Sequence, residues 1–252
     1  MAAADRFDRL DALRALAMVW MTAYHLVYDL NWFRLIPPQA MLTDPVWTLQ
    51  RTAIVTTFLF TAGLSQAVAL AQGQGWSRFW RRWAQVAGAA LLVSAGSALV
   101  FPQSFIYVGV LHGLALMLIV ARLSAGWGVW LWPAGALALI APSVAAIGLA
   151  DAPALAAWLN APGPNALGLI TQKPVTEDYV PLLPWLGVVW WGLAAGQWLT
   201  ARRPTILRGP VPGGAVGRRL AALGRWSLSY YLLHQPVMIG LLAAGVWLAG
   251  AR

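Results

Sequence analysis

Residues 127–149 read WGVWLWPAGALALIAPSVAAIGL, a run without a single charged residue. An α-helix needs about 20 predominantly apolar residues to cross the hydrocarbon core of a bilayer. Comparable runs lie near 10–31, 47–72, 83–101, 105–122, 181–200 and 221–248. They are too long and too continuously apolar for the alternating strands of an outer-membrane barrel. The sequence therefore predicts an all-α, polytopic transmembrane helix bundle of about seven spans. We expect a single transmembrane domain over residues 1–252.

Composition supports the membrane assignment and excludes several other classes. Of the 252 residues, 60% are hydrophobic and 10% are charged, whereas soluble domains carry roughly 25% charged residues. The net charge of +9 comes from arginines in short clusters between the apolar runs, which argues against a nucleic-acid-binding face. The chain has no cysteine, so disulfides and thiolate metal sites are excluded, and we expect no metal.

The arginine clusters predict an orientation for the bundle. If the N-terminus is cytoplasmic, the inner side receives most of them: Arg6, Arg9, Arg14, Arg78, Arg81, Arg82, Arg122, Arg202, Arg203, Arg208, Arg218, Arg219 and Arg225. The outer side keeps only Arg34, Arg51, Lys173 and Arg252. The positive-inside rule then gives an N-in, C-out, multi-pass protein of the bacterial inner membrane. The N-terminus has no clear A-x-A cleavage pattern, so we expect a retained first helix rather than a signal peptide.

The first apolar run carries a stripe of ionisable residues. At 100° per residue, Arg14 and His25 lie within about 20° of each other, and Asp11 and Asp29 within about 40° of His25. Ionisable residues inside a membrane are costly, so they are functional candidates that face a protein interior or a wet cleft.

His25 and Asp29 have the i, i+4 spacing of a carboxylate–imidazole pair. Such a pair holds the imidazole tautomer and stabilises the imidazolium after proton transfer, which makes His25 a candidate general base. The alternative is structural, with Asp29 capping the helix end and His25 a buried hydrogen-bonding group.

The two other histidines have a similar predicted depth. With the rise of 1.5 Å per residue, His112 and His234 fall in the outer half of their spans, as His25 does. Asp178 and Tyr179, just before the sixth span, lie over the same level. Sequence thus predicts one site in the outer half of the bundle, lined also by Tyr230, which shares a helix face with His234.

Four blocks of the chain resemble one known family. They are LDALRALA at 10–17 followed by Met21, His25 and Asp29; GVLH at 109–112; DYVPLLPWLG at 178–187; and SLSYYLLHQP at 227–236. Together, and in this order, they resemble the heparan-α-glucosaminide N-acetyltransferase catalytic-domain family, although Ala15 stands where many members have glycine. The resemblance implies a transmembrane acyltransferase that takes an acyl group, expected to be acetyl, from cytoplasmic acyl-CoA to a sugar amine or hydroxyl on the periplasmic side.

Roles for individual residues follow as hypotheses. We assign His25 as the base, oriented by Asp29, with His112 or His234 stabilising the oxyanion, and an acyl-histidine intermediate as a variant with ping-pong kinetics. Arg14 and Asp11 are assigned to acyl-CoA, and the acceptor is assigned to a second group: Asp178, Tyr179, Tyr230 and Gln235. The expected partners are the lipid bilayer, acyl-CoA, a glycan or other small acceptor and, as a further option, a second copy of the chain.

Two other functions fit the same residues. Histidines on separate helices could bind haem b for electron transfer. The polar stripe of the first helix could instead carry protons in a proton-coupled transporter, without any group transfer. The arginine-rich inner loops have two explanations as well. They either help to bind the phosphates of acyl-CoA or only set the topology of the helices.

Overall fold

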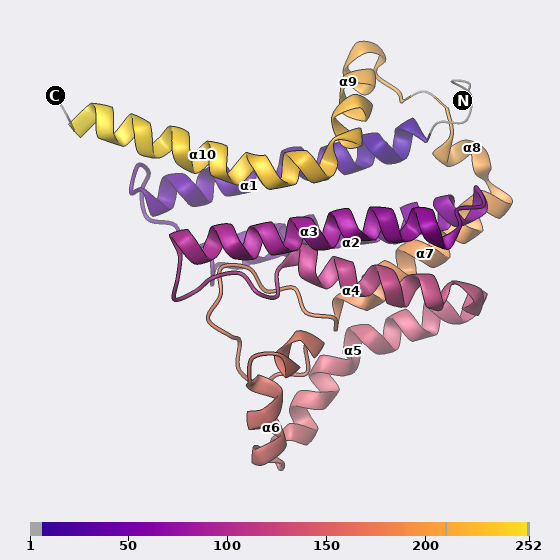
Figure 1. Ribbon diagram of the computed structural model, residues 1–252, viewed down its shortest axis with the longest axis horizontal. Helices are drawn as coiled ribbons and strands as arrows, with labels where there is room; N and C mark the ends of the chain where they lie inside the picture. Colours follow the sequence, from indigo (N-terminus) through magenta and orange to yellow (C-terminus); the bar gives the residue numbers. More distant parts are fainter. Residues whose placement is uncertain (1–6, 210, 251–252) are drawn as a thin grey trace. The chain divides into compact units, whose positions relative to one another are not determined.

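The computed structural model describes residues 7–209 and 211–250 and is helical throughout its regular elements there (Figure 1). In this part of the chain, extended backbone pairs only at the bridge between Val108 and Tyr179. The chain divides into two compact units, one formed by 1–58 with 205–252 and the other by 59–204. Arg6 and Arg252, which enter the orientation argument, lie outside the described residues.

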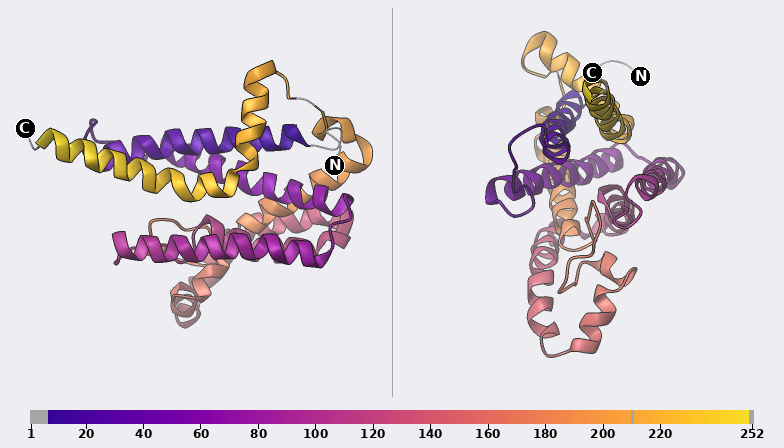
Figure 2. Two further views of the ribbon diagram at one scale, coloured as in Figure 1. Left: turned by 45° about the horizontal axis from the view of Figure 1, so that its top comes forward. Right: turned by 90° about the vertical axis from the view of Figure 1, so that its left-hand side faces the viewer.

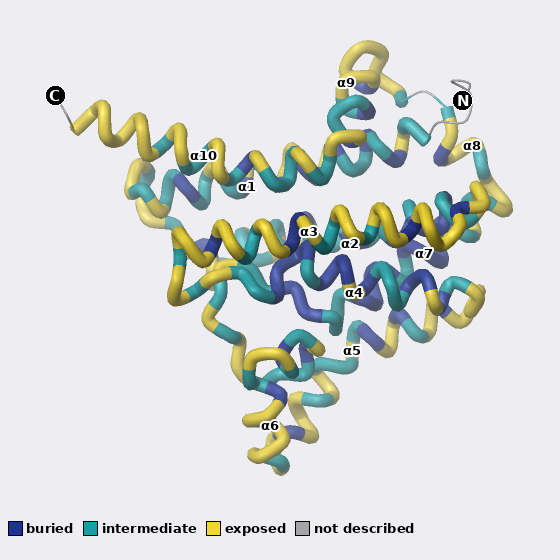
Figure 3. The backbone as a smooth tube through the Cα atoms, in the orientation of Figure 1, coloured by how far each residue is buried: buried dark blue, intermediate teal, exposed yellow. Residues whose placement is uncertain are grey.

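The first unit is built around α1 (Asp8–Trp32). In both views of Figure 2, α10 (Ser227–Gly250) runs beside α1, and α9 (Gly214–Arg225) packs against α1 near its N-terminal end. The beginning of α2 (Pro45–Ala71) and the short α8 (Pro204–Leu207) complete the set of helices. Apolar side chains cover most of α10 and are exposed in its C-terminal half (Figure 3), as expected for a helix whose solvent is lipid.

Gly224 lets α9 pack directly on the backbone of α1. A Cβ atom at this position would lie 1.8 Å from the backbone oxygen of Asp11, so a larger residue forces the helices apart. We predict that Gly224→Ala destabilises the protein by about 1–3 kcal/mol despite the better helix propensity of alanine. The measurement is the melting temperature in detergent, with Gly240→Ala as control because a Cβ there meets nothing within 4 Å. An equal melting temperature for both variants would contradict this packing.

The second unit has α4 (Val110–Leu123) at its centre. It packs against α3 (Trp76–Val100) and α7 (Trp185–Arg202), and α7 packs in turn against α5 (Leu131–Leu149), which follows the short 3₁₀ helix η2 (Ala125–Trp130). Two further short helices, α6 (Pro153–Asn160) and η3 (Pro164–Leu167), lie in the segment before α7. Figure 3 shows α4 as largely buried.

Close helix contact in this unit depends on glycine. A Cβ at Gly192 would lie 2.1 Å from the backbone oxygen of Phe60, and one at Gly196 2.6 Å from the Cβ of Ala67. The small-xxx-small spacing of these glycines therefore brings the backbone of α7 against the second half of α2, which is the usual use of this motif in membrane helices.

Among the described residues, four helical segments are long and apolar enough to cross a membrane: 45–71, 76–100, 125–149 and 227–250. The all-helical architecture is thus confirmed, and these four helices are candidate membrane spans. Helices also occupy the three other expected positions, near 10–31, 105–122 and 181–200. The seven spans, the N-in, C-out orientation and the single domain stay predictions.

Three helix ends differ from the sequence expectation. α3 begins at Trp76 rather than near 83, so Arg78, Arg81 and Arg82 lie on its first turns instead of in a loop; arginine is a good helix former. α4 begins at Val110 rather than 105, because the residues before it pair with the segment preceding α7. The last expected span, 221–248, is interrupted at Trp226, where α9 ends and α10 begins.

Candidate active site

His25 of α1 and His234 of α10 form a direct pair in the first unit. Their Nδ1 and Nε2 atoms, respectively, are 2.9 Å apart, and the rings are nearly parallel, at 14°. His234 is buried, with its Nδ1 2.8 Å from the backbone oxygen of Tyr231. The structure therefore brings together two histidines that are 209 positions apart in the chain.

The tautomers of the pair follow from its hydrogen bonds. The carbonyl of Tyr231 can only accept, so His234 Nδ1 donates to it and His234 Nε2 is the acceptor of the neutral ring. His25 Nδ1 then donates to His234 Nε2. A neutral imidazole with its proton on Nδ1 carries a lone pair on Nε2. His25 is therefore held in the tautomer that can accept a proton at Nε2.

Asp29 does not take the place beside His25 that its i, i+4 spacing predicted. Its Oδ1 accepts a hydrogen bond of 2.8 Å from Gln235 Nε2 of α10, while His234 occupies His25 Nδ1. The physical reason is that a buried carboxylate needs a hydrogen-bond donor. Asp29 is only 3% exposed, and the side-chain amide of Gln235 provides the N–H that it needs. Asp29 Oδ2 and Gln235 Oε1 are both buried without a partner among the described residues.

Tyr230 lies on the same face of α10 as His234. Its ring is parallel to that of His234, with centroids 5.9 Å apart. Thr22 Oγ1 donates to the backbone oxygen of Met18 at 2.8 Å, so it accepts from the Tyr230 hydroxyl at 2.7 Å. This bond joins α10 to α1 one turn before His25, and it holds the Tyr230 ring beside that of His234.

An ion pair within α1 lies at the N-terminal end of the predicted polar stripe. Arg14 Nη1 lies 2.6 Å from Asp11 Oδ1, and both side chains are partly buried. Arg14 and Asp11, which the sequence analysis assigned to acyl-CoA, are thus joined to each other.

His112 lies in the second unit and has both ring nitrogens engaged. Its Nδ1 accepts from the backbone N–H of Gly109 at 3.3 Å. Ser94 Oγ donates to the Ile106 carbonyl at 2.7 Å and so accepts from His112 Nε2 at 2.9 Å. These are the contacts of a residue that caps α4 and ties it to α3. The oxyanion role of His112 stays a prediction, and the proposal below does not use it.

Asp178 and Tyr179 join the segment before α7 to the start of α4. Asp178 Oδ2 accepts from the N–H of Val110 at 2.7 Å, which caps the first turn of α4. Burial raises the pKa of the Tyr179 phenol to about 12, so it stays protonated and donates to the Asn165 carbonyl at 2.7 Å. The acceptor contacts predicted for these two residues stay predictions.

The structural role of His112 is open to measurement. His112→Ala leaves Ser94 Oγ and the Gly109 N–H without their partner, and a lost buried hydrogen bond costs about 1–3 kcal/mol. We predict a melting temperature lowered by several degrees in detergent. His112→Asn, whose amide can still accept and donate, should recover part of the loss. A His112→Ala variant with the melting temperature of the wild type would contradict this structural role of His112.

Two of the groups that contact the histidines were not predicted from the sequence. The carbonyl of Tyr231, which sets the tautomer of His234, has no sequence signal. Ser94, the partner of His112, looked like an ordinary polar residue within an apolar run.

These features define a class of protein: a helical membrane protein with a hydrogen-bonded pair of histidines and, one turn away, a carboxylate oxygen that has no partner among the described residues. A family model described as heparan-alpha-glucosaminide N-acetyltransferase, catalytic, matches residues 6–236. The chain therefore belongs to this family, and the match runs through both compact units. Neither the curated proteins nor the solved structures gave a match.

Proposed function

We propose that this protein is a membrane acyltransferase that moves an acetyl group from cytoplasmic acetyl-CoA to a sugar amine or hydroxyl on the periplasmic side, with His25 as the base. The family supports a membrane acetyltransferase. The observation that carries the residue assignment is the hydrogen-bonded series from the Tyr231 carbonyl through His234 to His25. It holds His25 in the tautomer that a base requires, as a partner does for the histidine of a catalytic triad.

The proposed chemistry is a direct transfer. His25 Nε2 takes the proton of the acceptor N–H or O–H as the nitrogen or oxygen attacks the thioester carbonyl. The tetrahedral intermediate collapses, the C–S bond breaks, and the thiolate of CoA takes the proton back from His25. The imidazolium that forms in between keeps its Nδ1–H bond to His234, so its position does not change during the proton transfers.

Asp29 and Gln235 are suited to hold the acceptor. Their two unpartnered oxygens, Asp29 Oδ2 and Gln235 Oε1, are buried acceptors, and each lost partner costs free energy in an apolar site. An amine or hydroxyl donor from the acceptor would satisfy them, and Asp29 lies one helical turn from His25. Arg14, a guanidinium at the N-terminal end of the stripe, is assigned to a phosphate of CoA, which it would bind by its charge and planar geometry.

The test is acceptor-dependent release of CoA by the purified protein in proteoliposomes. Acetyl-CoA and glucosamine are supplied together and separately, and free thiol is measured. The proposal predicts thiol release that needs both substrates. Proton-coupled uptake of glucosamine without thiol release would favour the transporter, and a Soret band in the purified protein would favour haem binding.

A further inference from the structure

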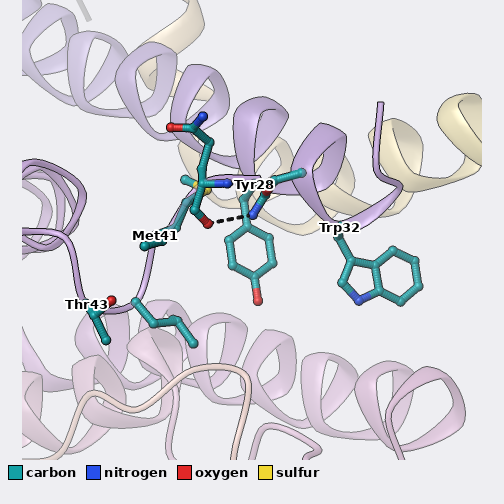
Figure 4. A pocket seen from close by; sticks show the side chains of 8 residues that line it. Tyr28, Trp32, Met41 and Thr43 are labelled. Atoms are coloured by element: carbon teal, nitrogen blue, oxygen red, sulfur yellow. Dashed lines mark hydrogen bonds between the residues drawn. The ribbon is translucent and has the colours of Figure 1, made fainter. Parts of the chain in front are cut away.

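Pockets of different chemistry lie in the two units. Figure 4 shows a pocket of about 230 Å³ at the C-terminal end of α1, and no side chain that lines it is charged. A pocket of about 330 Å³ opens at the start of α3 in the second unit. Its lining includes two arginines: Gly75, Ser77, Arg78 and Arg81. We call this second one the basic pocket, because its lining indicates an anionic ligand.

The arginines at the basic pocket have no counter-ion within the described ranges. Arg78, Arg81 and the neighbouring Arg82 are exposed, and none of them forms a hydrogen bond or an ion pair there. Ser77 adds a hydroxyl group to the lining. An arginine fork and a hydroxyl are the side-chain groups that bind phosphate oxygens well.

The carboxylates of the second unit, residues 59–204, lie away from the basic pocket. Glu177 accepts a hydrogen bond from Ser104, and Asp178 caps α4 beside the C-terminal end of α3, about 36 Å along that helix from its start. Asp151, the third acidic residue of the unit, follows the C-terminal end of α5. The positive charge at the start of α3 is therefore not balanced within the unit.

A buried arginine of α4 fixes the chain beside the basic pocket. Arg122 Nη2 donates to the backbone oxygen of Gln74, the residue before Gly75, and its guanidinium carbon lies 5.0 Å from the centroid of the Trp76 ring. Arg122 is only 9% exposed, and its Nη1 is buried without a partner in the part of the chain that the structure describes. This turn is thus preformed and carries a further positive charge, which a bound anion would stabilise.

An exposed apolar stripe leads away from the basic pocket along α3 (Figure 3). Three residues lie within about 20° of Arg81 around the helix and about 11, 17 and 27 Å further along it: Gly88, Leu92 and Leu99. Leu92 is 66% exposed and Leu99 is 86% exposed, and a Cβ at Gly88 would meet nothing within 4 Å. The stripe suits an apolar chain attached to an anionic head.

Tryptophans indicate the depth of this end of α3 in a membrane. Trp76 and Trp80 are 46% and 44% exposed, and their stacked rings have centroids 6.0 Å apart. Trp83 Nε1 donates to the Ala115 carbonyl at 2.8 Å, which fixes the next ring on α4. Tryptophans gather at the level of the lipid headgroups. The candidate span that begins at Trp76 therefore has the basic pocket at headgroup depth.

We propose that the basic pocket binds the phosphodiester headgroup of an anionic phospholipid, with an acyl chain along the stripe of Gly88, Leu92 and Leu99. Arg78 and Arg81 bind the phosphate by charge and planar geometry. Pockets that hold small molecules measure about 300 Å³ or more, so about 330 Å³ has room for a glycerol phosphate. Basic pockets on membrane helices recognise lipids in this way. The site is separate from the chemistry proposed at His25.

The test is native mass spectrometry of the whole purified protein in an uncharged detergent, titrated with dioleoylphosphatidylglycerol or dioleoylphosphatidylcholine. The wild type should bind one phosphatidylglycerol at least about tenfold more tightly than phosphatidylcholine. Arg78→Gln combined with Arg81→Gln should weaken that binding about 30-fold, the effect of two arginines near an anionic lipid. Equal affinity of the wild type for both lipids would overturn the proposal.

A second double variant is the matched control for charge. Arg202→Gln with Arg203→Gln, at the end of α7, removes the same charge from two exposed arginines that do not line the basic pocket. Its affinity for phosphatidylglycerol should stay within about threefold of the wild type. Equal losses in the two double variants would show attraction by net charge alone and would overturn the site.

Soluble phosphates are another source of the same chemistry, and competition distinguishes them from a lipid. Inorganic phosphate, glycerol phosphate and CoA are each added at the concentration of the bound phosphatidylglycerol. The proposal predicts that the lipid is retained in all three mixtures, because none of the competitors has a chain for the apolar stripe. Displacement by any of them would assign the basic pocket to a soluble phosphate and overturn the lipid assignment.

Leu92→Ser tests the path of the acyl chain. It should weaken binding of the dioleoyl lipid about threefold to tenfold, and leave dihexanoylphosphatidylglycerol unaffected because chains of six carbons do not reach Leu92. Leu91→Ser is the matched control, since Leu91 is 67% exposed but lies about 80° from Arg81 around the helix. Equal losses in the two serine variants would contradict a chain along this stripe.

Discussion

Replacing His25 with alanine is expected to lower kcat for acetyl transfer by about 10²–10⁴-fold, the usual contribution of a general base. The hydrogen bonds of the pair engage His25 Nδ1 and both ring nitrogens of His234. The lone pair that remains to accept a proton is therefore the one on His25 Nε2. Without it, the acceptor must lose its proton to water in a site built from apolar helices. The measurement is initial rate in proteoliposomes, normalised to folded protein by gel filtration.

Leu26→Ala is the matched control for this prediction. Leu26 is the next residue of α1 and is 42% exposed, on a different face of the helix from His25. Its truncation should leave kcat unchanged. A His25→Ala enzyme that works at the wild-type rate would exclude His25 as the base. A trapped acetyl group on wild-type His25, with ping-pong kinetics, would instead show the acyl-histidine variant.

His234→Phe is expected to lower kcat by about 10–100-fold, the loss seen when a metal-binding histidine loses the partner that orients its ring. Phenylalanine keeps a ring beside His25 and Tyr230 but cannot accept the His25 Nδ1–H bond. His25 is then free to adopt the other tautomer, with its proton on Nε2, where it cannot act as a base. We expect the KM of acetyl-CoA to stay unchanged, because His234 is assigned no contact with the donor.

His234→Gln distinguishes positioning from packing. The amide oxygen of glutamine can accept a hydrogen bond, so this variant should recover part of the lost kcat although its shape fits less well. If His234 only fills space, phenylalanine should be the better replacement, and that order would contradict the assigned role.

The helices were predictable because apolar runs of membrane length are the strongest signal in the chain. The positions at which the helices begin and end were less predictable. Residues 105–109 are as apolar as the helix that follows, but they pair with the segment around Tyr179, a contact between distant positions that no local pattern records. The break at Trp226 likewise lies beside a contact between distant positions, that of Gly224 with the backbone of α1.

The candidate site was predictable in its residues but not in its pairings. His25, His234 and Asp29 were chosen because ionisable groups in apolar helices are rare. Helical spacing then favoured Asp29 as the partner of His25, whereas α10 supplies a closer one in His234. The same rarity argument selected His112 and Asp178, whose contacts are those of helix caps. Spacing along the sequence cannot distinguish a side chain that caps a helix from one that binds a substrate.

The central claim is tested most directly by the fate of a labelled acetyl group. Purified wild-type protein and His25→Ala are reconstituted in parallel with acetyl-CoA labelled in the acetyl group and with glucosamine, and the sugar is analysed by mass spectrometry. The account predicts labelled N-acetylglucosamine or O-acetylated sugar from the wild type and at most about 1% of it from His25→Ala. Equal labelled product from both proteins, or none from folded wild type with any amine or hydroxyl acceptor, would contradict it.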